Sequence, residues 1–231
     1  MGQMISIDAL DGSGSFDAYC AMPQGVPKAA IIVIQEIFGV NPGIRKMADD
    51  WADLGYAALA PDLFWRLEPG VQLDADVEDE LKKAYGLMQE FDLDTAIKDV
   101  EAVIKKARSL TSGKVGLVGY CLGGRIAFLA ATRTDADANV GYYGGGIDKL
   151  LGERHAIGKP LLLHFGKEDA HIGADVQKTI HEALDGNPHV TIHDYDGVGH
   201  AFARAFGRSR NEAAANLADG RTRAFFAQHL G

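Results

Sequence analysis

The chain has 231 residues, of which 47% are hydrophobic, and a formal net charge of −9 at pH 7. This length and apolar content allow a large buried core, and because no linker or low-complexity tract interrupts the chain, we expect a single domain over residues 1–231. The negative charge argues against nucleic acid or an anionic membrane surface as a partner, because like charges repel.

Short apolar runs alternate with longer amphipathic segments along the chain. The predicted elements are, in chain order, strands at 4–8, 16–22 and 29–35, a helix at 41–55, a strand at 56–61, two helices within 75–110, a strand at 114–120, a helix at 122–132, strands at 138–144, 159–166 and 189–196, and a helix at 211–230. This alternation is typical of an α/β fold with a mostly parallel central sheet and helices on both faces. In such sheets, binding sites lie beyond the carboxyl ends of the strands.

The chain gives no sign of export. Its first residues, "MGQMISIDALDGSG", lack the basic and then apolar segments of a signal peptide, and no apolar stretch is long enough to span a bilayer. The only cysteines, Cys20 and Cys121, form neither a disulfide framework nor a CxxC pair. We therefore expect a cytoplasmic protein with two free thiols. Because no apolar stripe is suited to a subunit interface, we expect a monomer.

One cysteine lies where a strand is expected to turn sharply into a helix. The segment "GYCLGGR" (119–125) follows the apolar run "KVGLV" and has the G-x-nucleophile-x-G spacing of a nucleophile elbow, with Cys121 in place of the usual serine. The glycines allow the close backbone approach that such a turn needs, and the positive end of the helix dipole favours a thiolate. A buried cysteine that only packs is the alternative, as is a dinucleotide-binding loop, for which the glycine spacing is wrong.

An elbow of this kind predicts an acid and then a histidine later in the chain. Asp169 follows the strand at 159–166, and His200 follows the strand at 189–196. Taken singly, each is unremarkable in a loop, but the three residues in this order, each after its own strand, predict a catalytic triad. Glu168 is the rival acid and His171 the rival base.

Other polar residues at the strand ends have competing interpretations. Glu36 ends the strand at 29–35, and the loop "QEIFGVN" that contains it lies where a hydrolase of this plan takes one oxyanion N–H. His164 is more typical of a core histidine than of a ligand. A metal cluster can be drawn from His193, Asp194, Asp196 and His200, but an alternating strand places some of these side chains on opposite faces.

Taken together, these segments resemble the dienelactone hydrolases, a family with the α/β-hydrolase fold. The resemblance extends in order over nearly the whole chain and rests on "QEIFGVN" (35–41), "APDLFWR" (60–66), "AYGLMQEFD" (84–92), "GYCLGGR" (119–125), "GYYGGG" (141–146), "HFGKEDAHI" (164–172) and "GHAFAR" (199–204).

The resemblance implies a role for each matching residue. Cys121 is the nucleophile, His200 the base and Asp169 the residue that orients it, while Glu36 holds the thiol at rest and helps to deprotonate it when substrate arrives. The oxyanion hole consists of the backbone N–H groups of Ile37 and Leu122, and the substrate contacts are Arg204, Tyr85 and Phe38. No metal or organic cofactor is required.

One position departs from the family pattern. Members that cleave dienelactones carry a second carboxylate-binding arginine four residues before the tyrosine, where this chain has Leu81. We therefore expect hydrolysis of an ester or lactone through a cysteine thioester, with a carboxylesterase or thioesterase acting on a different, neutral substrate as the alternative. A non-catalytic or redox-sensing protein that keeps the fold is the alternative from another class.

Overall fold

A computed structural model describes residues 2–111 and 113–231. The chain divides into two compact units, residues 1–116 and 117–231. The expectation of a single domain stays a prediction, and each unit is described below by itself. No described helix is both long enough and apolar enough to cross a lipid bilayer.

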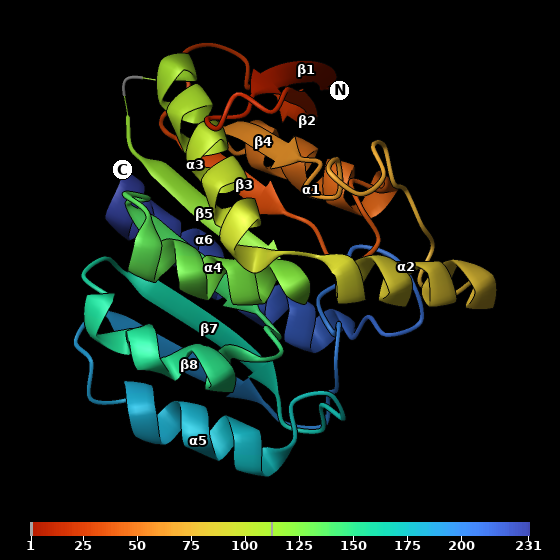
Figure 1. Ribbon diagram of the computed structural model, residues 1–231. Coiled ribbons are helices and arrows are strands. Elements are labelled where there is room, and N and C mark those ends of the chain that lie inside the picture. The colour runs from red at the N-terminus through yellow and green to blue at the C-terminus, as the bar shows by residue number, and fades with distance from the viewer. Residues whose placement is uncertain (1, 112) are drawn as a thin grey trace. The chain divides into compact units, whose positions relative to one another are not determined.

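The first unit combines strands with helices packed on them (Figure 1). Its elements are β1 (Gln3–Asp8), β2 (Ser15–Ala21), β3 (Ala30–Ile34), α1 (Pro42–Asp53), β4 (Ala57–Pro61), α2 (Glu78–Glu90) and α3 (Leu93–Leu110). The strand order is β1-β2-β4-β3, with β3 and β4 parallel and the other two pairs antiparallel. Helix α1 packs on β2, β3 and β4, and α3 packs on β1, β3 and β4. Strands β3 and β4 are therefore buried along their whole length.

The second unit repeats this plan with parallel strands. Its elements are β5 (Val115–Tyr120), which runs into the unit from the first, α4 (Leu122–Arg133), β6 (Ala138–Tyr142), the 3₁₀ helix η1 (Ile147–Ala156), β7 (Leu161–Gly166), α5 (Ala174–Leu184), β8 (Val190–Tyr195) and α6 (Glu212–Leu230). The strand order is β5-β6-β7-β8, and β7 is parallel to both of its neighbours.

Helices cover both faces of β6 in this unit. A Cβ added at Gly141 would meet the carbonyl oxygen of Gly124 in α4, whereas the hydroxyl of the next residue, Tyr142, contacts Asp219 and Thr222 in α6. Because neighbouring residues of a strand point to opposite faces, α4 and α6 lie on opposite sides of β6. The expected α/β plan of parallel strands with helices on both faces is confirmed here.

The local signals in the sequence explain where α1 begins and ends. The Asn41 side chain accepts a hydrogen bond from the Ile44 N–H at 3.1 Å, Pro42 occupies the first turn, and Gly55 takes a φ of +94° just after the helix.

All the strands and helices predicted above are present, with boundaries shifted by a few residues. Two further elements, η1 and α5, were not predicted.

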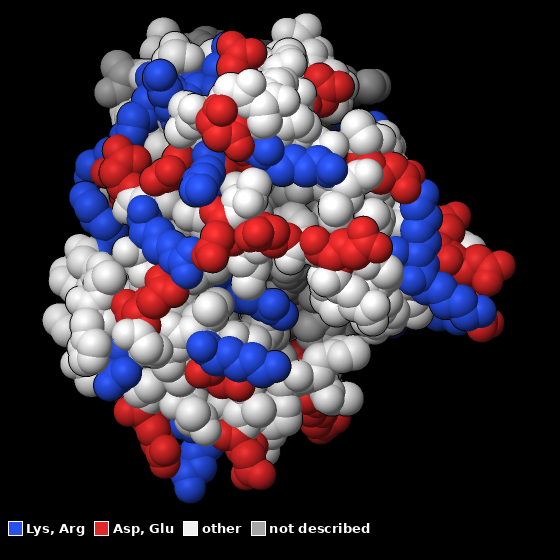
Figure 2. Space-filling view, viewed as in Figure 1, with Lys and Arg blue, Asp and Glu red and all other residues white. Residues whose placement is uncertain are grey.

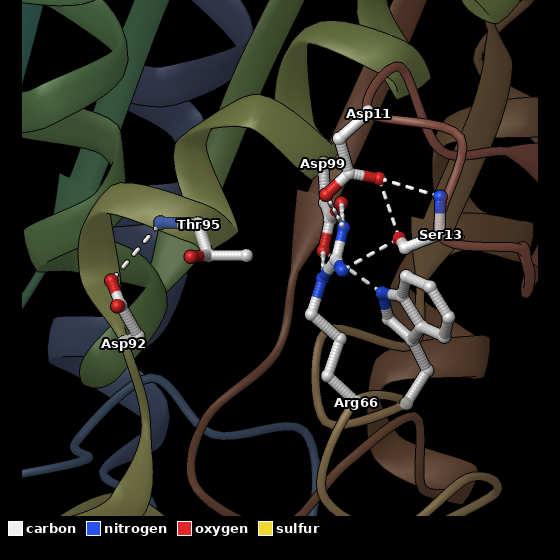
Figure 3. A network of polar contacts seen from close by, with 7 residues as sticks. Asp11, Ser13, Arg66, Asp92, Thr95 and Asp99 are labelled. Carbon is white, nitrogen blue, oxygen red and sulfur yellow. Dashed lines mark hydrogen bonds and ion pairs between the residues drawn. The ribbon is translucent and has the colours of Figure 1, made fainter.

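A buried ion pair joins α3 to two loops of the first unit (Figure 3). The carboxylate of Asp99 accepts bonds from Arg66 Nη2 at 2.7 Å, Arg66 Nε at 2.9 Å and Trp65 Nε1 at 2.8 Å. Arg66 also bonds to Asp11 and Ser13 in the turn between β1 and β2. The segment "APDLFWR" thus has a structural role, because bidentate geometry and an indole donor satisfy a carboxylate that is nearly inaccessible to water.

The structure shows how charged side chains are distributed on one face and where the two cysteines lie. On the face shown in Figure 2, basic side chains are interspersed with acidic ones. Both cysteines are free thiols: Cys20 is buried in β2, and Cys121 is partly accessible. Burial raises the pKa of the Cys20 thiol.

Candidate active site

Cys121 occupies a strained turn between β5 and α4. It has φ = 54° and ψ = −110°, a conformation that side-chain-bearing residues rarely adopt, and it forms the N-cap of α4. Its backbone N–H donates to the Tyr142 carbonyl oxygen at 3.0 Å, which ties the turn to β6. The turn is as tight as the elbow motif predicts, because a Cβ added at Gly119 would lie 1.9 Å from the Gly123 carbonyl oxygen.

The same contact predicts that Gly119→Ala is strongly destabilising. A methyl group at residue 119 meets backbone and not a flexible side chain, so the turn must open, and we expect a loss of about 3 kcal/mol in the free energy of unfolding, measured by urea denaturation. Gly220→Ala is the control. Gly220 is exposed inside α6 with nothing within 4 Å of an added Cβ, and this change is expected to stabilise the protein by about 0.5–1 kcal/mol. Equal effects at the two positions would contradict the tight-turn interpretation.

Asp169 and His200 form a hydrogen-bonded pair. His200 Nδ1 lies 2.7 Å from Asp169 Oδ2, and the other carboxylate oxygen accepts the N–H groups of His171 at 2.7 Å and Ile172 at 3.1 Å. Burial raises the pKa of Asp169, but these hydrogen bonds outweigh it and hold the pKa below its usual value. Asp169 is thus a preformed anion that faces the imidazole, whereas the rival acid, Glu168, is exposed.

His200 also contacts Cys121. Burial lowers the pKa of His200, but hydrogen bonds to Asp169 and Cys121, together with the negative charges of both partners, raise it to about 10. The imidazole is therefore protonated at neutral pH and lies between a carboxylate and a sulfur atom. The structure brings together the three residues that the sequence order had singled out.

Two aromatic rings contact the His200 imidazole. The Tyr143 ring is edge-on to it at a centroid distance of 5.1 Å, and the ring of His171, the rival base, lies at 4.8 Å but is exposed. Among described non-glycine residues, positive φ values occur at Cys121, Tyr143 and Ala201 alone. Strain in the described residues is thus concentrated around this imidazole, as is common at functional sites.

The remaining predicted residues are placed as follows. Leu122 opens α4, so its N–H belongs to the first turn, where the positive end of the helix dipole lies. Arg204 follows β8 and is half-buried, and its carbonyl oxygen accepts a bond from Arg210. In the first unit, Glu36, Ile37 and Phe38 are buried in the loop after β3, whereas Tyr85 is exposed on α2. Their roles toward Cys121 stay predictions.

The loop that carries Glu36 is fixed by its neighbour. Gln35 is fully buried at the end of β3, and its side-chain oxygen accepts the Leu63 N–H at 3.1 Å. Glu36 is therefore held on an ordered segment, and 3% of the residue is exposed.

Other histidines have structural roles. His164 is fully buried and contacts the Tyr195 hydroxyl at 2.8 Å and the Thr222 hydroxyl at 3.0 Å, and burial holds its pKa well below 6.5. It is therefore the satisfied core histidine expected from the sequence. Within residues 2–111 and 113–231, no group of three or more His, Cys, Asp or Glu side chains is arranged to hold a metal ion.

The chain is similar over nearly its whole length to several known proteins. A family model described as "Dienelactone hydrolase family" matches residues 16–230. A protein of Azospirillum brasilense named "Putative carboxymethylenebutenolidase" is 47% identical, with 98% of this chain and 99% of that protein covered. The "Carboxymethylenebutenolidase" of Pseudomonas putida is 41% identical, with 96% and 95% covered. The "Crystal Structure of Putative Dienelactone Hydrolase" from Klebsiella pneumoniae has a TM-score of 0.87 at 29% identity and covers 99% of both chains.

Proposed function

The chain belongs to the dienelactone hydrolase family, and from this premise we propose that it opens a dienelactone-type lactone through a thioester on Cys121. It is a carboxylic ester hydrolase with the α/β-hydrolase fold. The observation that supports the nucleophile is the continuous contact from Asp169 through His200 to Cys121 at the strained start of α4.

In the proposed first step, the Cys121 sulfur attacks the substrate carbonyl carbon. The carbonyl electron pair moves to oxygen, and the oxyanion is stabilised by the Leu122 N–H and, as the resemblance implies, by the Ile37 N–H. When the intermediate collapses, the ring C–O bond breaks and the departing oxygen takes the proton from His200. A pKa of about 10 means that His200 holds this proton at neutral pH and can give it to the departing oxygen.

In the second step, water replaces the sulfur. Neutral His200 removes a proton from water, the hydroxide oxygen bonds to the thioester carbon, and the C–S bond breaks to release the acid and return the thiolate. Asp169 keeps the ring in one orientation throughout. We propose that Glu36 holds the Cys121 thiol before substrate binds and takes its proton when substrate displaces the carboxylate, so that the sulfur attacks as a thiolate. Arg204, Tyr85 and Phe38 are proposed to contact the substrate.

Two measurements test this proposal. Turnover against a panel of unsaturated lactones, aryl esters and thioesters identifies the substrate class, and mass spectrometry of protein quenched during turnover locates the acyl group. We expect lactone hydrolysis and a mass increase on the peptide that contains Cys121. Hydrolysis with no acylated cysteine would reject the thioester route, and a thiol that never acylates would favour a non-catalytic or redox-sensing protein.

A neutral ester or a thioester is the second candidate substrate class, because residue 81 on α2 is leucine. If Arg204 is the one fixed cation for the substrate carboxylate, Leu81→Arg supplies the second. We expect kcat/KM for a carboxylate-bearing dienelactone to rise about ten-fold, since 1.4 kcal/mol corresponds to a factor of ten. A neutral aryl ester is the control and is expected to gain little. Equal gains on both substrates, or none on the dienelactone, would show that this position does not set specificity.

A further inference from the structure

The first turn of α4 carries an arginine that contacts a glycine loop. Arg125 lies one helical turn after Cys121, and its Nε–H donates to the carbonyl oxygen of Gly145, in the loop after β6. Burial lowers the pKa of Arg125, and the charges of Cys121 and Asp148 raise it. The bond to Gly145 is a direct polar contact of the Arg125 side chain.

The glycine loop, residues 144–146, packs closely against this turn. A Cβ added at Gly144 would lie 2.7 Å from the carbonyl carbon of Gly124 and 2.8 Å from the nitrogen of Arg125. Gly146 has a φ of +85°, and a Cβ there would lie 3.0 Å from three atoms of the guanidinium group. The loop conformation and the arginine side chain are therefore fitted to one another, and only glycine allows this approach.

The glycine loop continues directly from a residue that contacts the histidine. Tyr143, fully buried with a φ of 39°, immediately precedes Gly144, and its ring packs edge-on against the His200 ring. Its N–H donates to the His164 carbonyl oxygen at 2.8 Å, which fixes one end of the segment. The bond from Arg125 to Gly145 fixes the other end.

We propose that Arg125 is a positioning residue for the reaction: by holding Gly145 it fixes the Tyr143–Gly146 segment and keeps the His200 ring in line between Asp169 and Cys121. The catalytic consequence rests on the proposed function, because it requires His200 to transfer protons to and from substrate. The effect on the position and pKa of the His200 imidazole does not depend on the proposed function.

Arg125→Gln and Arg125→Met form a matched pair that separates this role from a purely electrostatic one. Both variants remove the positive charge. Glutamine carries its Nε2–H₂ donor at the same position along the side chain as the arginine Nε, whereas methionine carries a methyl group there. A difference between the two variants therefore reports the hydrogen bond to Gly145, and thermal unfolding of both shows whether the fold is kept.

The readouts are steady-state kinetics and the pKa of His200 from NMR titration of its ring C–H signals. For Arg125→Met we expect kcat to fall roughly ten-fold with KM within about two-fold, because a small misplacement of a catalytic group is costly. We also expect the pKa of His200 to fall clearly below about 10, because its bonds to Asp169 and Cys121 loosen. Arg125→Gln is expected to keep kcat close to the wild-type value, and the pKa of His200 is not expected to fall in this variant.

The sign of the pKa change decides the outcome. Loss of a nearby positive charge alone would raise the pKa of His200, so equal rises in both variants would overturn the proposal in favour of an electrostatic role. Indistinguishable kcat and pKa values for the two variants would overturn it as well. Since the titration uses no substrate, it tests the position of the imidazole even if the proposed hydrolysis proves wrong.

Discussion

Cys121→Ala is expected to abolish ester and lactone hydrolysis while leaving the fold intact. The sulfur is the proposed nucleophile, whereas the turn depends on the close backbone approach at Gly119 and does not need the thiol. Loss of a nucleophile that works with a histidine typically lowers kcat by many orders of magnitude. Turnover is measured against the best lactone of the panel, with circular dichroism to check folding.

Cys20→Ala is the matched control for this change. Cys20 is buried in β2 of the first unit, and its replacement is expected to leave kcat near the wild-type value. More than about 1% of wild-type turnover in Cys121→Ala would refute the nucleophile assignment. Cys121→Ser is also expected to be poor, because a hydroxyl is much harder to ionise than a thiol beside an imidazolium.

Asp169→Asn is expected to lower kcat by about 10³–10⁴-fold. An amide neither stabilises the imidazolium nor holds the ring in a single tautomer, and the change removes the carboxylate hydrogen bond that contributes most to raising the pKa of His200. NMR titration should show that pKa falling, in parallel with the loss of turnover. Glu168→Gln, the change at the exposed neighbouring carboxylate, is expected to do neither. If the two variants behaved alike, Asp169 would not be the orienting acid.

The same pair makes stability depend on pH. The folded-state pKa of His200, about 10, lies above the value of about 6.5 for an unfolded histidine. Its contribution is therefore fully present below about pH 6.5 and is lost as the pH rises through about 10. The difference in Tm between the wild type and Asp169→Asn is expected to shrink over this range, and a constant difference would contradict the linkage.

The sequence predicted the elements whose signals are local. The continuous apolar run of β3 and the N-cap and proline of α1 need no tertiary information to be read. Helix α5 was missed because its apolar period is broken: Gln177 is buried between its apolar residues and is satisfied by the carbonyl oxygens of Gly166 at 2.8 Å and Ile172 at 2.7 Å. With one of its three buried residues polar, α5 has only Ile180 and Leu184 as buried apolar residues, which is a short signal for a helix.

In the candidate site too, some residues could be predicted from the sequence, whereas other contacts could not. Cys121, Asp169 and His200 each follow a strand, so their spacing along the chain predicted that they lie together, and the structure places them in contact. The contacts of Arg125 and Tyr143 depend on positive φ values and on backbone packing between segments distant in sequence. The glycine run in "GYYGGG" was the available signal, but glycines alone do not say which side chain packs against them.

The two thiols differ in accessibility, and this difference sets how many of them a reagent can reach in the folded protein. Cys20 is enclosed in β2, with its ionisation opposed by burial, whereas Cys121 is partly accessible beside a protonated imidazole. Thiol reagents and peroxide are therefore expected to act on Cys121 and to spare Cys20 in the folded chain. With Cys121 as the proposed nucleophile, one equivalent of an alkylating agent is expected to count the active molecules of a preparation, and reversible oxidation to a sulfenic acid is expected to stop turnover until a reductant restores the thiol.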